Sequence, residues 1–207
     1  VMNLAKQDDW PFAVCSPENM PVSRHVAKLT EQYTGQPFGP GAMPRCSPLV
    51  LAEALNWLEH RFVFIAPDEA VTIPAILEQA KLLVARCGIR GLILDPWNEF
   101  EHTRPHGQTE TEYISTSLGQ LRRFARAYQV HVWVVAHPQK LYRLDDKTYP
   151  VPTPYDISGS AHWRNKADNC LTVWRDEKLP DEPVQIHVQK VRFREVGSPG
   201  VALLRFN

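Results

Sequence analysis

The sequence predicts an α/β fold with a mostly parallel central sheet, flanking helices and an antiparallel hairpin at the C-terminal end. Short apolar runs alternate along the chain with segments of helical period. These runs are continuous rather than alternating in polarity, which is typical of parallel strands covered on both faces. The last two runs flank Gly197-Ser198-Pro199-Gly200, a turn sequence that predicts a hairpin at the edge of the sheet.

Seven of the runs have the length and composition of strands, being rich in branched aliphatic or aromatic residues. In chain order they are 12–15, 62–65, 91–95, 130–136, 170–174, 184–190 and 201–206. We find no internal repeat and no low-complexity linker, so we expect residues 1–207 to form a single domain. A chain of this length is long enough to bury a sizeable core.

Four helices are predicted between the strands, and the ends of three of them are marked. Ser47 followed by Pro48 is typical of an N-cap with proline at the first helical position. Gly88 predicts a C-terminal stop, and Thr109 with Glu112 predicts a capping box. The helices are 21–33, 48–60, 74–87 (with Cys87 among its inward residues) and 109–128.

Composition excludes several classes of protein. The 23 basic and 23 acidic residues cancel, so nucleic-acid binding has to rest on a local basic patch. No run of 18 or more apolar residues is present, so we expect no membrane span. The N-terminal residues show no signal-peptide pattern, so we expect a cytoplasmic protein. The four cysteines lack Cys-x-x-Cys spacing, which favours reduced thiols over disulfides or zinc.

Polar side chains follow three predicted strands at the ends where parallel sheets bind ligands. Glu18 follows the first strand, Asp95 ends the central one and His137 follows the next. Asp95 could hold Mg²⁺ through water, Glu18 could orient or deprotonate an attacking water, and His137 could sense the phosphate being cleaved. Three unrelated residues at the starts of loops explain the spacing equally well.

Three segments resemble a known family. Gly91-Leu92-Ile93-Leu94-Asp95 resembles the Walker B strand of RecA-like ATPases. Residues 156–169, from Asp-Ile-Ser-Gly-Ser to Ala-Asp-Asn, are similar to a motif of DnaB-type replicative helicases. Residues 189–193, followed by Gly197, resemble the K-x-R-F strand ending of phage primase-helicases and the mitochondrial helicase. The second and third motifs are the specific ones, and the resemblance covers nearly the whole chain in the right order.

The resemblance implies a RecA-like motor core that hydrolyses ATP or another NTP with Mg²⁺. Residue by residue, it implies that Glu18 is the catalytic glutamate, Asp95 the magnesium-associated acid and His137 the γ-phosphate sensor. It also implies that Arg192 is an arginine finger reaching the nucleotide of a neighbouring subunit, with Lys190 beside it on the same strand face. A solvated face of an edge strand is the alternative explanation for Lys190 and Arg192.

The implied partners are single-stranded DNA, further copies of the chain in a ring, expected to be a hexamer, and an attached primase domain. Residues 137–155 occupy the place of a DNA-binding loop, in which Lys140, Arg143 and Lys147 would contact phosphates. Tyr142 or Tyr149 could stack on a base. An ordinary solvated loop explains the same composition. A zinc site at Glu101, His102 and His106 lacks the usual ligand spacing.

One departure from the family concerns the phosphate-binding loop. No G-x-x-x-x-G-K-[ST] sequence occurs, since none of the ten glycines precedes a lysine. We therefore expect a phage or prophage motor core truncated just after this loop, which by itself binds nucleotide weakly and hydrolyses almost none. The alternatives are a non-hydrolysing RecA-like module that binds DNA or a partner, and a hydrolase that uses Asp95 and His137 without a nucleotide.

Overall fold

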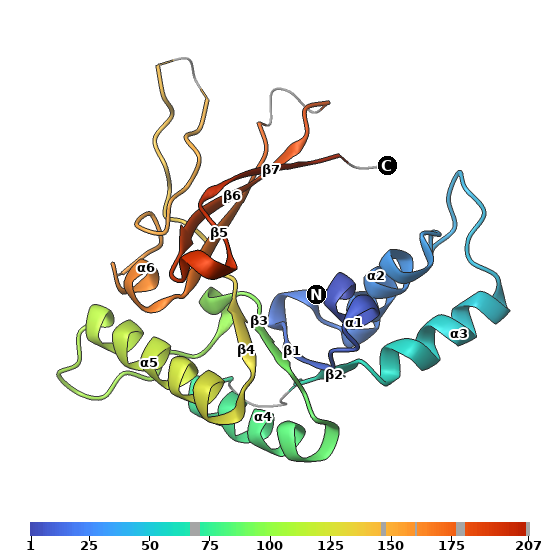
Figure 1. Ribbon diagram of the computed structural model, residues 1–207, viewed down its shortest axis with the longest axis horizontal. Coiled ribbons are helices and arrows are strands. Elements are labelled where there is room, and N and C mark those ends of the chain that lie inside the picture. Colours follow the sequence, from blue (N-terminus) through green and yellow to red (C-terminus); the bar gives the residue numbers. More distant parts are fainter. Residues whose placement is uncertain (67–70, 146–147, 160, 177–180, 206–207) are drawn as a thin grey trace. The chain divides into compact units, whose positions relative to one another are not determined.

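The computed structural model describes residues 1–66, 71–145, 148–159, 161–176 and 181–205 (Figure 1). The chain divides into two compact units, each described separately. The first contains residues 1–103 and 121–136, and the second contains residues 104–120 and 137–207. That both units act as one domain stays a prediction.

The first unit is built on a four-stranded parallel sheet with the strand order β2-β1-β3-β4. Its strands are β1 (Phe12–Cys15), β2 (Phe62–Phe64), β3 (Gly91–Leu94) and β4 (His131–Val134). Phe12 pairs with both Phe62 and Gly91, and Leu94 pairs with Val134. The predicted parallel sheet is confirmed, and the carboxyl ends of all four strands lie at the same edge of it.

Aromatic packing covers the sheet face that carries Phe12. The helices α1 (Met2–Gln7), α2 (Val22–Thr34) and α3 (Pro48–Glu59) contribute buried side chains to this layer. The ring of Phe12 is fully buried and stacks on Phe62 with centroids 5.6 Å apart. A Cβ on Gly91 would lie 2.3 Å from Cδ1 of Phe12, so only glycine fits beside this ring. The register of the sheet therefore depends on a small residue facing a large one.

The helix α4 (Ile73–Cys87) buries Ile73, Ile76, Leu77 and Ala80. As predicted, it ends at Gly88, which has a left-handed φ of 62°. The prediction that Cys87 points inward is wrong, because burial falls along the helix and its last residue is exposed. Cys15 and Cys46 are buried free thiols, and burial raises the pKa of Cys15 to about 12.

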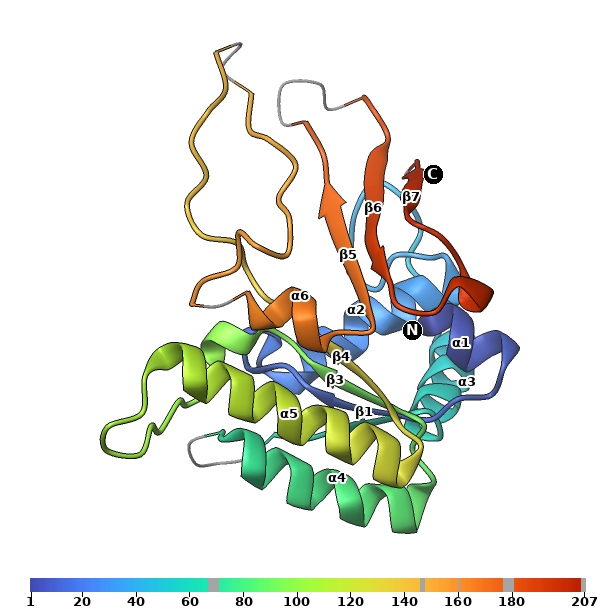
Figure 2. The same cartoon turned by 60° about the vertical axis from the view of Figure 1, so that its left-hand side comes forward.

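The second unit contains a three-stranded antiparallel sheet, β5-β6-β7 (Figure 2). Its strands are β5 (Asn169–Trp174), β6 (Val184–Val191) and β7 (Gly200–Leu204). The predicted hairpin of the last two strands is confirmed, and β5 joins it as a third antiparallel strand. The prediction that it lies at the edge of the parallel sheet is wrong, because these three strands pair only with one another, in a separate sheet. The short helix α6 (His162–Lys166) precedes β5 and was not predicted, because five residues are too few to show a helical period.

Helix α5 (Glu110–Tyr128) begins in the second unit and continues into the first. The described residues also form three short 3₁₀ turns: η1 (Pro17–Asn19), η2 (Trp97–Glu99) and η3 (Arg194–Val196). Within the described residues, no helix combines the length and the apolar character that crossing a membrane requires.

The capping box predicted at the start of α5 is confirmed. The backbone N–H and the hydroxyl of Thr109 donate to Oε2 of Glu112 at 2.9 and 2.8 Å, and the N–H of Glu112 donates to Oγ1 of Thr109 at 3.3 Å. The hydrogen bonds from Thr109 lower the pKa of the Glu112 carboxyl from its ordinary value of 4.5. The ionised carboxylate therefore stabilises the folded state.

The variant Glu112→Gln should be less stable than the parent protein at neutral pH. Because the native pKa is depressed, the stabilisation is present above pH 4.5 and is lost as the pH falls through the native pKa. Urea unfolding at neutral pH and at about pH 2 measures this dependence. Glu53→Gln, which removes an exposed carboxylate from α3, controls for the loss of one charge. An equal destabilisation by Glu112→Gln at both pH values would contradict the prediction.

Candidate functional site

The turns after β1 and β3 meet at the carboxyl edge of the parallel sheet. Asp95 directly follows β3, and its backbone N–H donates to the carbonyl oxygen of Cys15 at 3.0 Å. The turn η1, which contains Glu18, begins two residues after Cys15. The pairing of β1 with β3 thus continues to the point where both segments leave the sheet. It brings together residues that are 79 positions apart in sequence, such as Ser16 and Asp95.

The carboxylate of Asp95 is oriented by two neutral donors from the turn after β1. Oγ of Ser16 and Nδ2 of Asn19 lie 3.2 and 3.3 Å from Oδ2 of Asp95. Nδ2 of Asn19 also donates to Oγ of Ser16 at 2.8 Å, and Nζ of Lys28 donates to Oδ1 of Asn19 at 2.9 Å. Because Ser16 and Asn19 are uncharged, they orient the carboxylate without neutralising its charge.

This arrangement fits the chemistry of a magnesium site. Hard carboxylate oxygens are the protein ligands that Mg²⁺ prefers, commonly with water in between. Asp95 is half-buried, while Glu18 is exposed on η1 between Ser16 and Asn19. The structure thus brings Asp95 and the turn that carries Glu18 to the same edge. The catalytic roles of both residues stay predictions.

His25 and Asn19 are site residues that the sequence analysis missed. His25 is a half-buried residue of α2 whose ring packs edge-on against Phe64, with centroids 5.3 Å apart. Burial lowers the pKa of His25, the charge of Asp95 raises it, and the charge of Lys28 lowers it. His25 and Lys28 are three residues apart on α2, and this spacing is the sequence signal that could have placed His25 and Lys28 on one face of the helix.

The prediction that places His137 at the same edge of the sheet is not decided by the strand pairing. Within the first unit, the N–H of Val135 donates to the carbonyl of Leu94 at 2.9 Å, which brings the end of β4 to the edge where Asp95 lies. His137 is exposed and begins the next segment of the second unit. Its role as a phosphate sensor stays a prediction.

Residues 156–159 and 161–169 include groups that contact the first half of α5. Oγ1 of Thr111 donates to the carbonyl of Gly159 at 2.7 Å, and Nζ of Lys166 donates to the carbonyl of Ser115 at 2.5 Å. Gly159 has a φ of 86°, and a Cβ there would lie 2.5 Å from Cδ1 of Ile114. Glycine at position 159 therefore meets two requirements, a left-handed backbone conformation and a close approach to α5.

Lys190 and Arg192 are bound to the end of α6. Nζ of Lys190 donates to the carbonyls of Arg164 and Ala167 at 2.5 and 2.8 Å. Nε of Arg192 lies 2.5 Å from Oδ1 of Asp168. Both residues are half-buried. β6 pairs with β7 only over residues 184–188, so beside Lys190 its paired strand is β5.

Burial lowers the pKa of Lys190, and the nearby positive charges of Arg192 and Arg164 lower it further. Cys170 and Asp168 act in the opposite direction. The carbonyl oxygens at the C-terminal end of a helix carry partial negative charge, which compensates two cations placed so close together. The sequence analysis identified these cations but not their acceptors.

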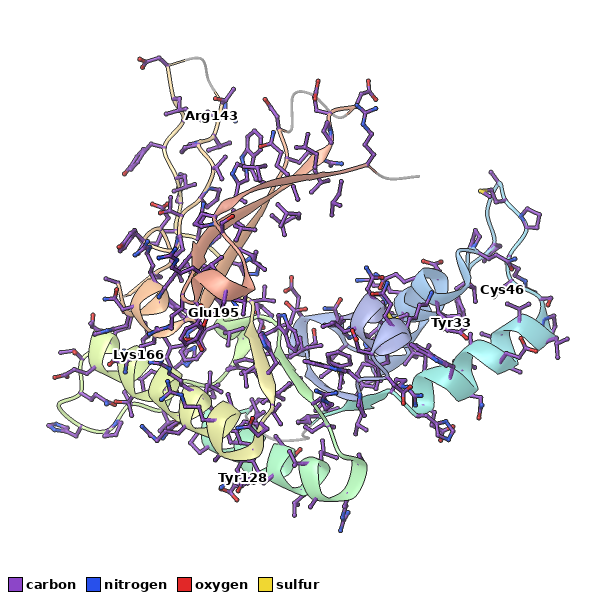
Figure 3. The ribbon with its side chains drawn as sticks, in the orientation of Figure 1. Tyr33, Cys46, Tyr128, Arg143, Lys166 and Glu195 are labelled. Carbon is purple, nitrogen blue, oxygen red and sulfur yellow. The ribbon has the colours of Figure 1, made fainter. Side chains whose placement is uncertain are left out.

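The exposed loop after β4 contains Lys140 and Arg143, of which Arg143 is labelled in Figure 3. The guanidinium of Arg143 lies over the ring of Tyr149, 5.0 Å from its centroid, and Tyr142 is exposed. Lys147 lies outside the described residues. The end of the loop is hydrogen-bonded to the antiparallel sheet, because the carbonyl of Pro152 accepts hydrogen bonds from side chains of β5 and β6. These donors are Thr172 at 3.0 Å and Gln189 at 2.7 Å.

A cavity of 380 Å³ lies between this loop and the end of β5. Arg143 and Arg175 contribute positive charge to its wall, Asp176 contributes a negative one, and Tyr149 and Trp174 contribute aromatic rings. The sequence analysis did not identify Trp174 or Arg175. They follow the end of the loop, residue 155, by 19 and 20 residues and come close to it only through the folding of the second unit.

The zinc alternative gains no support from the geometry around His102. Its ring stacks on Trp97 with centroids 4.8 Å apart, and Nε2 lies 3.1 Å from the carbonyl oxygen of Trp97. Across the part of the chain that the structure describes, no three His, Cys, Asp or Glu side chains are grouped so that they could hold a metal.

Comparison with known proteins shows what the chain is similar to. The chain is 42% identical over 214 residues to the Twinkle homolog protein, chloroplastic/mitochondrial, of Arabidopsis thaliana. The match covers 99% of the chain and 30% of that relative. The predicted resemblance to DnaB-type helicase domains is confirmed. No protein-family model matches the chain.

Two solved structures show that the chain has the RecA-like fold of DnaB-type helicase domains. One is a solved ATPase domain of a DnaB-like helicase, with a TM-score of 0.74 and 15% identity over 100% of this chain and 78% of that one. The other is a DnaB-like replicative helicase described with its interactions with primase. It has a TM-score of 0.75 and 17% identity over 97% of this chain and 50% of that one.

The relative's name assigns it to chloroplasts and mitochondria, so a cytoplasmic location for this chain stays a prediction.

Substitution of Gly159 should destabilise the second unit. Gly107 is a matched control, because it has a φ of 84° but no atom within 4 Å of an added Cβ. Gly107→Ala should cost about 1 kcal/mol for backbone strain alone. Gly159→Ala should cost roughly 1–3 kcal/mol more, since its Cβ meets the buried Ile114. Urea unfolding measures both, and equal losses would contradict the close approach.

Proposed function

We propose that the chain is part of the motor core of a hexameric DNA helicase that hydrolyses ATP or another NTP and moves along single-stranded DNA. The observation that supports this most is the arrangement at Asp95. Its half-buried carboxylate is oriented by Ser16 and Asn19, beside the turn that carries Glu18. The chain spans 30% of its Twinkle relative, so the activity is proposed for the intact protein that contains these residues.

Asp95 would hold the magnesium ion of the nucleotide, which supplies charge stabilisation on the phosphates when bound. Glu18 would orient the attacking water and accept its proton, because it is the exposed acid of the neighbouring turn. His137 would sense the γ-phosphate from the end of β4. The donors on Asp95 keep its oxygens in one orientation, which lowers the cost of ordering them during the reaction.

Arg192 would act in trans on the nucleotide bound by a neighbouring subunit, with Lys190 beside it. A guanidinium supplied from another subunit stabilises the negative charge of the transferring phosphoryl group. This role requires self-association into a ring, for which we propose six subunits.

Single-stranded DNA would bind along the loop after β4 through Lys140, Arg143 and Lys147. The first two are exposed, as phosphate contacts require. Beneath the loop, Arg175 and the rings of Tyr149 and Trp174 line the cavity, where a base could stack. A partner primase domain and a phage or prophage origin are further parts of the proposal.

The proposal requires a phosphate-binding loop outside these residues, because no G-x-x-x-x-G-K-[ST] sequence occurs among the 207. The same observation favours a second candidate, a non-hydrolysing module that binds DNA or a partner subunit. The two candidates differ in whether the intact protein hydrolyses ATP.

Mixed rings of the intact protein test the proposed function. Arg192→Ala and Asp95→Asn should each lower the ATPase rate, by about 10³-fold for Arg192, while nucleotide binding to each subunit remains. A mixture of the two variants should regain part of the activity. Some interfaces then combine an intact Asp95 from one subunit with an intact Arg192 from its neighbour.

Arg194→Ala is the matched control, because it removes an exposed arginine from the adjacent turn η3. It should leave the ATPase rate close to that of the parent protein. Mixed rings that form without regaining activity would contradict the role of Arg192 in trans. An intact protein with no ATPase activity at all would favour the non-hydrolysing candidate.

A further inference from the structure

We propose that Asp168 is a positioning residue that orients the guanidinium of Arg192 toward a neighbouring subunit. This inference rests on the proposed function, in which Arg192 acts in trans. Asp168 is the acid of the Ala-Asp-Asn sequence that lies between α6 and β5. The resemblance gave this residue no role.

Two contacts join Asp168 to Arg192. The backbone N–H of Arg192 donates to the carbonyl of Asp168 at 2.9 Å, and Nε of Arg192 lies 2.5 Å from Oδ1 of the same residue. The next pair along the two strands is Asn169 with Val191. The ion pair is therefore held in place by the start of the β5–β6 ladder, which limits its freedom to shift.

The remaining contacts occupy one edge of the guanidinium. Nη2 of Arg192 donates to the carbonyls of Asn165 and Ala167 at 2.9 and 3.2 Å. A guanidinium has five N–H donors in a rigid plane, so partners on Nε and Nη2 set the direction of Nη1. Among the described residues, no hydrogen-bond acceptor is found for Nη1.

Exposure agrees with an orienting role. The side chain of Arg192 is 27% exposed and that of Asp168 is 47% exposed, so the pair is accessible from solvent. Lys190 shares the carbonyl of Ala167 with Arg192, which places both cations on one acceptor group at the end of α6. An arginine held at one edge and open at the other can meet a phosphate without first losing its own ion pair.

The intact protein carrying Asp168→Ala tests this role. The maximal ATPase rate with single-stranded DNA should fall about tenfold, because the guanidinium loses its orientation. The KM for ATP should stay within about twofold, since Asp168 does not contact the nucleotide of its own subunit. Asp168→Asn keeps a polar oxygen beside Nε but removes the negative charge, so it should restore part of the rate. It also tests the role if the alanine variant does not fold. Glu195→Ala, which removes an exposed acid from the turn after Arg192, should leave the rate unchanged.

The double variant separates this inference from the proposed function. If Asp168 acts through Arg192, Asp168→Ala should add no further loss in an Arg192→Ala background. A normal rate for Arg192→Ala alone would overturn the proposed function. A strong loss for Arg192→Ala together with an unchanged or raised rate for Asp168→Ala would overturn only the positioning role. Additive losses in the double variant would also overturn it.

Discussion

The parallel pairing of β1 with β3 is the constraint on which the candidate site depends. Because both strands run in the same direction, the turn that follows β1 meets the residue that follows β3. The buried ring of Phe12 above Gly91 holds this register, since a shift of one residue would move the ring to the opposite face. Ser16 and Asn19 can reach Asp95 only in this register.

In the second unit, too, strand pairing brings distant residues together, here through the antiparallel ladder of β5 and β6. The pairing of β5 with β6 brings the Ala-Asp-Asn sequence beside the K-x-R-F sequence, and the carbonyls of α6 receive the two cations. Two motifs that look independent in the sequence thus form one cluster. Gly159 ties the first of them to α5, because only glycine allows the backbone that close to Ile114. Contacts within the second unit therefore account for Gly159, Lys190 and Arg192 in the two motifs.

Local patterns predicted much of the fold. Continuous apolar runs predicted the parallel strands, and Ser47, Gly88 and Thr109 predicted helix ends that the structure confirms. Features that depend on distant partners were missed, namely the antiparallel pairing of β5 and the donors Ser16 and Asn19, while α6 was missed because it is too short to show a helical period. The prediction for Cys87 was wrong because a helical period shows which face of a helix is apolar, but not how far along the helix that face is buried. The residue types and their positions after strands predicted the candidate site residues. Their hydrogen-bond and ion-pair partners are shown only by the folded structure.

The account's central claim is that the edge formed by β1 and β3 performs ATP hydrolysis in the intact protein. The most direct measurement is the ATPase rate of Glu18→Gln with ATP binding measured in parallel. Glu99→Gln is the matched control, because Glu99 lies in the equivalent 3₁₀ turn after β3. The account predicts a loss of at least about a hundredfold for Glu18→Gln with ATP binding retained, and a normal rate for the control. Unchanged turnover in Glu18→Gln would contradict the claim.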